Sequence, residues 1–218
     1  MDQAKDQYEA LQPVLTKHVD ELESIIVATG KTLEGNSFYQ HETLTKREAL
    51  VPKQVNLFWA GLQAKTRICE IGFNAGHSTL LLLLGRDTPL DFTVFDIGHH
   101  DYTKPCLEYM KQAFPKVTFE YIEGDSTMKV PQWTAKNADR MGTYDVVHVD
   151  GGHSEHCIRN DMKNAVRLVA PGGILIIDDT DSPHINKYVD IYLALGDFVE
   201  VPIFTTPMYP HRMLRRLQ

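Results

Sequence analysis

The stretch from Arg67 to Ser78 limits what this chain can fold into more than any other part of the sequence. A short apolar run turns on Gly72 and Gly76 and leads into five consecutive leucines at 80–84, with Ser78 as a candidate helix cap. A strand, a glycine turn and a buried helix form the first half of a βαβ unit. Glycines let a ligand approach bare backbone, and a helix N-terminus offers free N–H groups. The stretch predicts a nucleotide-type cofactor site, although a tight turn without a ligand would share the pattern.

The glycine spacing separates two classes of cofactor. A dinucleotide fingerprint needs three glycines, G-x-G-x-x-G, whereas this turn has two, as G-x-x-x-G, with Glu70 two positions before the first. A carboxylate disfavours a pyrophosphate and favours a cationic sulfonium. The pattern E-x-G-x-x-x-G resembles motif I of the class I S-adenosylmethionine (SAM)-dependent methyltransferases. The resemblance implies that SAM contacts this stretch, at Glu70, Gly72, Asn74, Gly76, His77 and Ser78.

Bulk properties exclude several classes of protein. A chain of 218 residues suits one domain, and its formal charge of −7 argues against a nucleic-acid groove. The one dense basic cluster, Arg212, Arg215 and Arg216, indicates a solvated strand face. The three cysteines have no paired spacing, which suits a reducing compartment, and no apolar run reaches the roughly 18 residues of a membrane helix. With no run resembling a signal peptide, we expect a cytoplasmic protein without a membrane or nucleic-acid partner.

The hydrophobic pattern alternates between strand and helix after a helical N-terminal segment. We expect helices at 1–30, 44–64, 102–114, 154–169 and 182–196, and strands starting at Arg67 and then at 91–96, 117–122, 144–150, 173–178, 198–203 and 212–217. This order predicts an α/β fold with a doubly wound, mostly parallel sheet of seven strands and an antiparallel C-terminal hairpin. The whole chain, 1–218, then forms one domain, in which 1–65 is a helical cap or lid and 66–218 is the cofactor-binding core.

Polar residues follow the second and third strands of the predicted sheet. Ligands of open α/β sheets bind outside the carboxyl ends of the strands. Asp96 ends the second strand and can accept both ribose hydroxyls, although it could instead cap a helix. Asp125 and Ser126 follow the third strand, where they would meet the adenine edge. These residues extend the predicted cofactor site.

Carboxylates also follow the fourth and fifth strands. Asp150 and His153 end the fourth strand, and Asp178 and Asp179 end the fifth. Neighbouring strands lie about 5 Å apart, so three carboxylates would crowd one site and repel without a counter-charge. Mg²⁺ or Mn²⁺ would relieve the repulsion, although two solvated aspartates could also cap a helix. We expect Asp150 to serve both the cofactor and the metal.

A closer resemblance rests on these residues. The strings D-G-x-H-S at 150–154 and P-G-G-x-L-x-x-D-D at 171–179 resemble the metal-dependent macrocin- and mycinamicin-type O-methyltransferases of sugars and small molecules. The resemblance covers about 66–180. It implies a Rossmann-like methyltransferase fold, Mg²⁺ at Asp150, Asp178 and Asp179, and His153 as the catalytic base. Some family members use an aspartate two residues after the first ligand, where this chain has Gly152.

We therefore expect a SAM-dependent, Mg²⁺-assisted O-methyltransferase that acts on a sugar, glycan or other small polyhydroxyl acceptor. Methyl transfer from a sulfonium mainly requires positioning and deprotonation of the acceptor, which a metal and a histidine can provide. His148 lies inside a strand and is expected to be structural. The alternatives are a metal-independent methyltransferase, an NAD(P)-linked oxidoreductase that uses Asp96 for its ribose, and a non-catalytic SAM-binding partner protein. The sequence leaves a homo-oligomer open.

Overall fold

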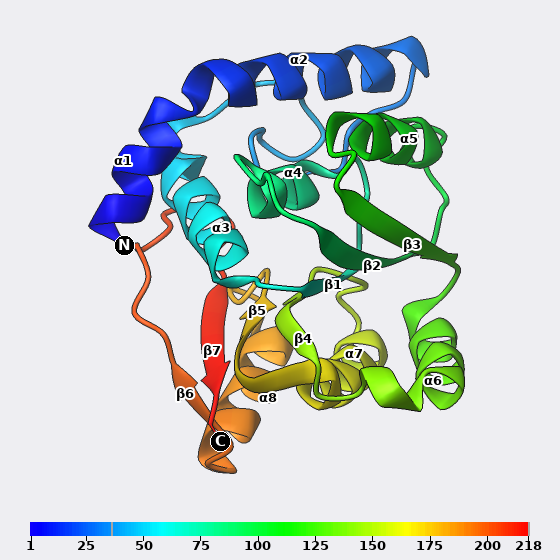
Figure 1. The fold of residues 1–218 in the computed structure, drawn as a ribbon, viewed down its shortest axis with the longest axis vertical. Coiled ribbons are helices and arrows are strands. Elements are labelled where there is room, and N and C mark those ends of the chain that lie inside the picture. The colour runs from blue at the N-terminus through cyan, green and yellow to red at the C-terminus, as the bar shows by residue number, and fades with distance from the viewer. Residues whose placement is uncertain (36, 218) are drawn as a thin grey trace.

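The computed structural model describes residues 1–35 and 37–217, which form one seven-stranded sheet with helices on both faces (Figure 1). The strands are β1 Arg67–Ile71, β2 Leu90–Asp96, β3 Val117–Glu123, β4 Tyr144–Val149, β5 Val169–Ile177, β6 Phe198–Glu200 and β7 Arg212–Arg216. The α-helices are α1 Asp2–Ala10, α2 Gln12–Ala28, α3 Val51–Gln63, α4 His77–Leu83, α5 Thr103–Ala113, α6 Ser126–Lys136, α7 Glu155–Leu168 and α8 Pro183–Ala194. Short 3₁₀ helices lie at Glu48–Leu50 and Ala138–Arg140.

The strand order is β3-β2-β1-β4-β5-β7-β6, with β1 to β5 parallel and β7 antiparallel to both of its neighbours. The predicted doubly wound fold and its antiparallel C-terminal hairpin are confirmed. The order reverses at β1, which lies between β2 and β4. The carboxyl ends of these central strands therefore open a crevice at the switch point, where ligands of such sheets bind.

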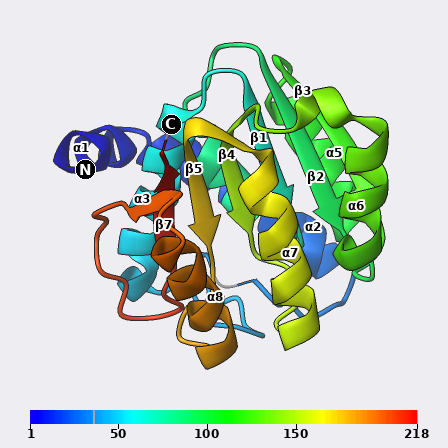
Figure 2. The same ribbon diagram turned by 90° about the horizontal axis from the view of Figure 1, so that it is seen from below.

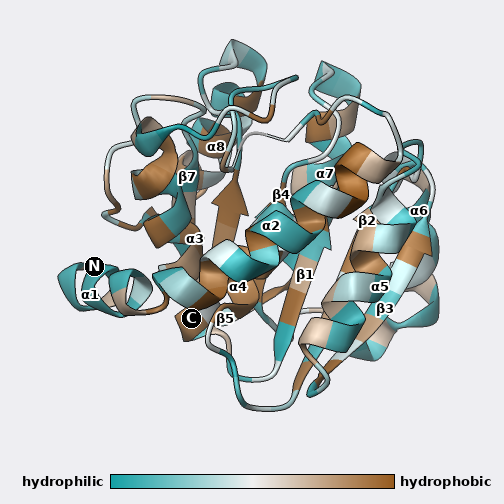
Figure 3. Cartoon of the chain, turned by 90° about the horizontal axis from the view of Figure 1, so that it is seen from above, coloured by the Kyte–Doolittle hydropathy of each residue, from teal (hydrophilic) through white to brown (hydrophobic). Residues whose placement is uncertain are grey.

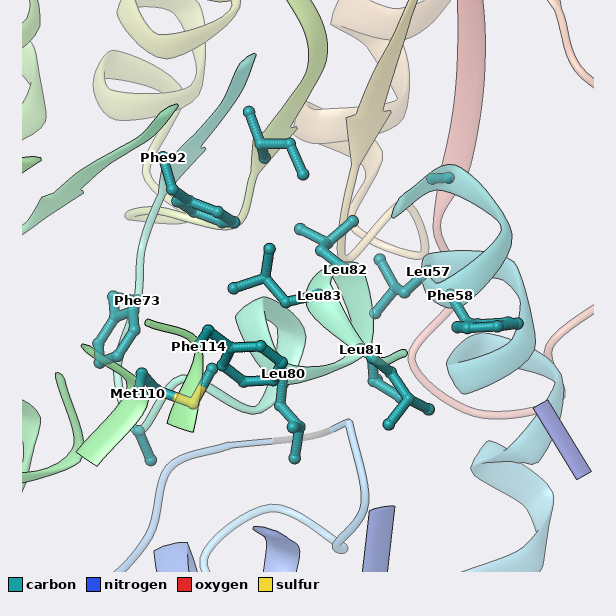
Figure 4. Close-up of a cluster of buried hydrophobic side chains, with 14 of the residues drawn as sticks. Leu57, Phe58, Phe73, Leu80, Leu81, Leu82, Leu83, Phe92, Met110 and Phe114 are labelled. Atoms are coloured by element: carbon teal, nitrogen blue, oxygen red, sulfur yellow. The ribbon is translucent and has the colours of Figure 1, made fainter. Parts of the chain in front are cut away.

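Two hydrophobic layers cover the sheet. Helices α2 to α5 contribute to the core on one face, and α6, α7 and α8 contribute to the core on the other, as Figures 1 and 2 show. Figure 4 shows that the leucines of α4, Leu80 to Leu83, lie between two groups of apolar side chains. One group is Leu57 and Phe58 on α3, and the other is Phe92, Met110 and Phe114. β5 carries the hydrophobic colouring of a strand inside a sheet (Figure 3). This packing holds the site-bearing strands rigidly.

Two prolines mark the starts of helices in the N-terminal segment. Pro13 and Pro52 each occupy the first turn of a helix, α2 and α3, because the missing N–H group costs nothing there. Pro13 was expected either to kink or to start a helix, and it lies in the first turn of the second of two helices within 1–30. The helix expected at 44–64 with an interruption near Pro52 is the 3₁₀ helix from Glu48 followed by α3. Among the described residues, the loop between α2 and α3 runs across the carboxyl ends of the strands.

Three further expectations about secondary structure were wrong. Ser78 does not cap α4, because Gly76 holds the N-cap position with φ +78° and Ser78 lies inside the helix. β5 begins at Val169, before the Pro171-Gly172-Gly173 turn that was expected to precede it, and a register shift against β4 accommodates that turn. Helix α6 was not anticipated, because Pro131 interrupts its sequence pattern. The helix begins at the cap Asp125, whose side chain accepts from Thr127 N.

Candidate active site

A cavity of about 480 Å³ opens at the carboxyl ends of the central strands, and the N-terminal segment contributes to its lining. Ten of the sequence-predicted residues line it: Gly72, Asn74, His77, Ser78, Asp96, Asp125, Ser126, Asp150, His153 and Asp179. Glu70, Gly76 and Asp178 do not. The sequence did not anticipate that Glu34, Ser37 and His41 of the N-terminal segment also line the cavity. The structure thus brings most of the predicted cofactor residues and the predicted base to one place.

The glycine turn is built for close backbone contact. Gly72 has φ +95°, and a Cβ atom there would lie 1.9 Å from the carbonyl oxygen of Asp150. Only glycine allows β1 and the end of β4 to approach so closely. Asp96 Oδ2 accepts from the N–H groups of Phe73 and Asn74, both at 2.8 Å, and Oδ1 accepts from Gly98 at 2.7 Å. Asp96 therefore fixes the turn, and its contact with a ribose stays a prediction.

Glu70 is fully buried and faces away from the cavity. Its Oε2 accepts from Thr79 Oγ1 on α4, and its Oε1 lies 2.9 Å from His148 Nδ1 on β4. The direct cofactor contact expected for Glu70 does not agree with this placement. A carboxylate without water must be paired inside the protein, and here it links the first strand, the first helix of the βαβ unit and the neighbouring strand. His148 lies inside β4 and outside the cavity lining, and its structural role stays a prediction.

His77 and Asp125 both line the cavity and differ in charge. The His77 ring packs edge-on against Phe38 and Tyr39, with ring centroids 5.4 Å away in each case, and burial lowers the pKa of His77 to about 4. Asp125 accepts from the side chain and the backbone of Thr127, and these hydrogen bonds lower the pKa of the Asp125 carboxyl. At neutral pH His77 is therefore uncharged and Asp125 is anionic.

His153 forms a pair with Asp179 at the edge of the cavity. His153 Nε2 lies 2.9 Å from Asp179 Oδ2, and 62% of the His153 side chain is exposed. The hydrogen bond to Asp179 raises the pKa of His153 to about 8, against a smaller opposing effect of burial. Asp179 holds a left-handed backbone conformation, φ +53°, which aspartate tolerates better than most residues. A basic imidazole is thus oriented by a carboxylate and open to a ligand.

Asp178 belongs to a separate, buried group. Lys53 Nζ on α3 lies 2.7 Å from Asp178 Oδ2, and both side chains are inaccessible to solvent. His148 Nε2 is 3.8 Å from the same oxygen. Burial alone would raise the pKa of Asp178, but Lys53 and His148 overcome it and hold that pKa well below its usual range. The sequence did carry a signal for Lys53, because Lys53, Gln54 and Asn56 are polar residues within a mostly apolar helix. All three side chains are buried in the structure.

The three predicted metal ligands are divided between two groups. Ligand atoms of Asp150, His153 and Asp179 lie within 4.8 Å of one another, and so do those of His148, Asp150 and Asp178. Burial, followed by repulsion from Asp178 and Asp179, raises the pKa of Asp150 to about 7. The counter-charge that the sequence assigned to a metal is supplied at Asp178 by Lys53. A divalent cation still fits the cavity side, where Asp150 and Asp179 offer oxygens.

Within residues 1–35 and 37–217, none of the helices combines the length and the apolar character that crossing a membrane requires.

Comparisons with known proteins agree with this geometry. A family model described as a methyltransferase domain matches residues 69–180, which include every sequence-predicted site residue. Among solved structures, a candidate O-methyltransferase from Klebsiella pneumoniae aligns with TM-score 0.58 and 16% identity over 94% of this chain and 90% of that one. The O-methyltransferase from Bacillus cereus in complex with SAH aligns with TM-score 0.60 and 14% identity over 93% and 91%. No curated protein matches the sequence.

Proposed function

Because this chain belongs to the methyltransferase domain family, we propose that it is a SAM-dependent O-methyltransferase. Its acceptor would be a hydroxyl of a sugar, a glycan or another small polyhydroxyl compound, and Mg²⁺ or Mn²⁺ would assist. The observation that carries this proposal is the His153–Asp179 pair, which faces the same cavity as the glycine turn. The whole chain acts as one unit in this proposal, since the segment 1–65 lines part of the cavity and pairs with Asp178.

The residues around the glycine turn would hold SAM. Gly72 gives access to bare backbone, Asp96 holds the turn in shape, and Asp125 and Ser126 begin a helix whose N-terminus faces the cavity. Bound SAM supplies a sulfonium-activated methyl group. The carboxylates at Asp96 and Asp125 suit a ligand that carries positive charge. The Bacillus cereus neighbour, with SAH in its crystal structure, supports this assignment.

His153 would take the acceptor proton. Nε2 of its ring faces Asp179, so Nδ1 is the nitrogen directed to accept the proton of the hydroxyl. Asp179 then stabilises the imidazolium that forms and fixes the orientation of the ring. Asp150 and Asp179 would hold the cation next to this nitrogen. A divalent cation lowers the pKa of a hydroxyl that it contacts, which eases the removal of the proton.

The charges of the lining limit the acceptor. Within the described residues, the lining has five carboxylates and five histidines and neither lysine nor arginine: Glu34, Asp96, Asp125, Asp150, Asp179, His41, His77, His99, His100 and His153. Phosphate groups are normally bound by lysine, arginine or helix N-termini. The five carboxylates would repel a phosphorylated acceptor, whereas neutral, hydroxyl-rich acceptors can form hydrogen bonds with both the imidazoles and the carboxylates.

A metal-independent methyltransferase is the second candidate, because Lys53 already neutralises Asp178 and His153 already pairs with Asp179. One experiment tests both. Candidate glycans and polyols are incubated with enzyme and SAM, with either Mg²⁺ or excess EDTA, and screened by mass spectrometry for the gain of one CH₂. Turnover that EDTA abolishes and Mg²⁺ restores supports the first candidate, and turnover that survives EDTA supports the second. Failure to bind SAM in calorimetry contradicts both.

A further inference from the structure

We propose that Lys53 is a positioning residue that acts as a built-in counter-charge for Asp178, and that it leaves Asp150 and Asp179 as the carboxylates available to a divalent cation. The inference deepens the proposed function and rests on it for the identity of the reaction. It concerns which side chains bind the cation, a property that can be measured without turnover.

Both carboxylate oxygens of Asp178 already have partners. Oδ2 lies 2.7 Å from Lys53 Nζ, and Oδ1 accepts the N–H of Asp179 at 2.9 Å. Asp178 does not line the cavity, whereas Asp150 and Asp179 do. A cation that approached from the cavity would meet Asp150 and Asp179 first. It would reach Asp178 Oδ2 only by displacing a buried ammonium group.

The buried group also contains a lysine, whereas the cavity side does not. Lys53 Nζ lies 2.7 Å from Asp178 Oδ2 in the interior. Asp150 and Asp179 line the cavity, and among the described residues its lining includes neither lysine nor arginine. Because a divalent cation is attracted to uncompensated negative charge and repelled by the nearby lysine, the electrostatics place it on the cavity side.

Lys53 comes from a part of the chain outside the family match. It lies on α3, whereas the match begins at residue 69. The N-terminal segment thus supplies a charge that changes the use of a residue in the matched core. Lys53 also joins α3 to the end of β5, so one side chain couples the placement of the segment with the charge of the site.

The test measures Mn²⁺ affinity by electron paramagnetic resonance on purified full-length variants. The Lys53→Met/Asp178→Asn double variant removes both charges and is expected to fold, because a buried ion pair can often be replaced by neutral groups without loss. It should bind Mn²⁺ within about threefold of the wild type, whereas Asp150→Asn should weaken binding about 10- to 100-fold. A double variant that binds as poorly as Asp150→Asn overturns the proposal, because Asp178 is then a ligand.

The Lys53→Met single variant gives a readout that loss of packing would not produce. It removes the positive charge beside Asp178, so Mn²⁺ should bind at least about tenfold more tightly than to the wild type, because the repulsion from the buried ammonium is gone. Lys53→Arg keeps the charge and should retain wild-type affinity. Lys116→Met, which breaks the exposed pair with Asp87, is the matched control and should change nothing. A folded Lys53→Met protein with wild-type affinity overturns the proposal.

Two further outcomes are decisive. If Lys53→Met does not fold, the double variant alone decides, as described above. If the wild type binds no Mn²⁺ at millimolar concentration, the cation assignment to Asp150 and Asp179 is overturned. SAM calorimetry on the same samples separates this failure from failure of the proposed function, because a methyltransferase without a cation site still binds SAM.

Discussion

Two histidine–carboxylate pairs in this protein have the same distance between their atoms and very different surroundings. His153 Nε2 and Asp179 Oδ2 are 2.9 Å apart at the cavity, and His148 Nδ1 and Glu70 Oε1 are 2.9 Å apart in the interior. The His153 side chain is 62% exposed, whereas His148 and Glu70 are 0% exposed. The geometry of a pair therefore does not tell what the pair does.

The two histidines differ in the pH at which each releases its proton. Burial opposes the charged form of His148, but the nearby Asp178 carboxylate and the hydrogen-bonded Glu70 carboxylate outweigh it and raise the pKa of His148 to about 10. The pKa of His153 is about 8, so this ring exchanges a proton close to neutral pH and in contact with solvent. Only the cavity pair meets both requirements of a general base, access and a suitable pKa.

The largest expected effect falls on turnover. His153→Ala should lower kcat by about 10²–10⁴, because the acceptor hydroxyl loses its general base. SAM affinity and thermal stability should stay close to wild type, since His153 is mostly exposed. Steady-state kinetics at saturating Mg²⁺ and pH 7, with calorimetry for SAM, measures both. A kcat within about threefold of wild type would remove His153 from the mechanism.

The buried pair should respond in stability. Glu70→Gln leaves His148 charged and without its carboxylate, which should lower the free energy of unfolding by about 3–5 kcal/mol. Asp179→Asn is the matched change at the cavity pair, and it should cost less, about 1 kcal/mol, because its partner His153 is mostly exposed and remains in contact with water. Asparagine also tolerates the left-handed backbone of residue 179. Urea unfolding compares the two, and equal losses would contradict the assigned roles.

Sequence patterns predicted most of the fold and the location of the site, because these depend on local and periodic features. The glycine turn, the seven strands and the aspartates at strand ends all follow from residues close together in the chain. The division of the aspartates into a cavity group, Asp150 and Asp179, and a buried residue, Asp178, does not follow from such local features. It depends on Lys53, which lies 125 positions before Asp178 along the chain and reaches it only through tertiary packing.

Glu70 also shows that sequence patterns do not reveal the tertiary partners of a side chain. Its position before Gly72 predicted a cofactor contact, but the direction of its side chain is set by Thr79 and His148. The basic cluster lies on a strand, as expected, and there Arg212 pairs with Glu200 and Asp190. Sequence patterns thus located charged groups well and could not identify the partners that fix their roles.

A third carboxylate tests whether cofactor binding is separate from both pairs. Asp96→Ala should weaken SAM binding about tenfold or more, because the turn loses the acceptor of three backbone N–H groups, at Phe73, Asn74 and Gly98, each bond worth about 1.5 kcal/mol or more when charge-assisted. Calorimetry measures the affinity, with Asp179→Asn as the control that should bind SAM normally. Unchanged affinity in a folded Asp96→Ala protein would exclude this role.

The smallest expected effect is a shift in pH dependence, and it distinguishes the two carboxylates nearest His153. His153 must be neutral to accept a proton, so kcat/KM should rise as pH increases through about 8, the pKa that the hydrogen bond to Asp179 sets. Asp179→Asn removes that charge, and the limb should move down towards the ordinary histidine value of about 6.5. The free energy of unfolding should follow the same titration. Because the pKa of His153 is higher in the folded protein than in the unfolded chain, the pair adds its full stabilisation below about pH 6.5, and this stabilisation is lost as the pH rises through about 8. Asp150, with a pKa of about 7, is the rival source of the limb. If the limb stays in place in Asp179→Asn and disappears in Asp150→Asn, measured for all variants at the same saturating Mg²⁺ concentration, then Asp150 controls the proton and the pairing of His153 with Asp179 only orients the ring.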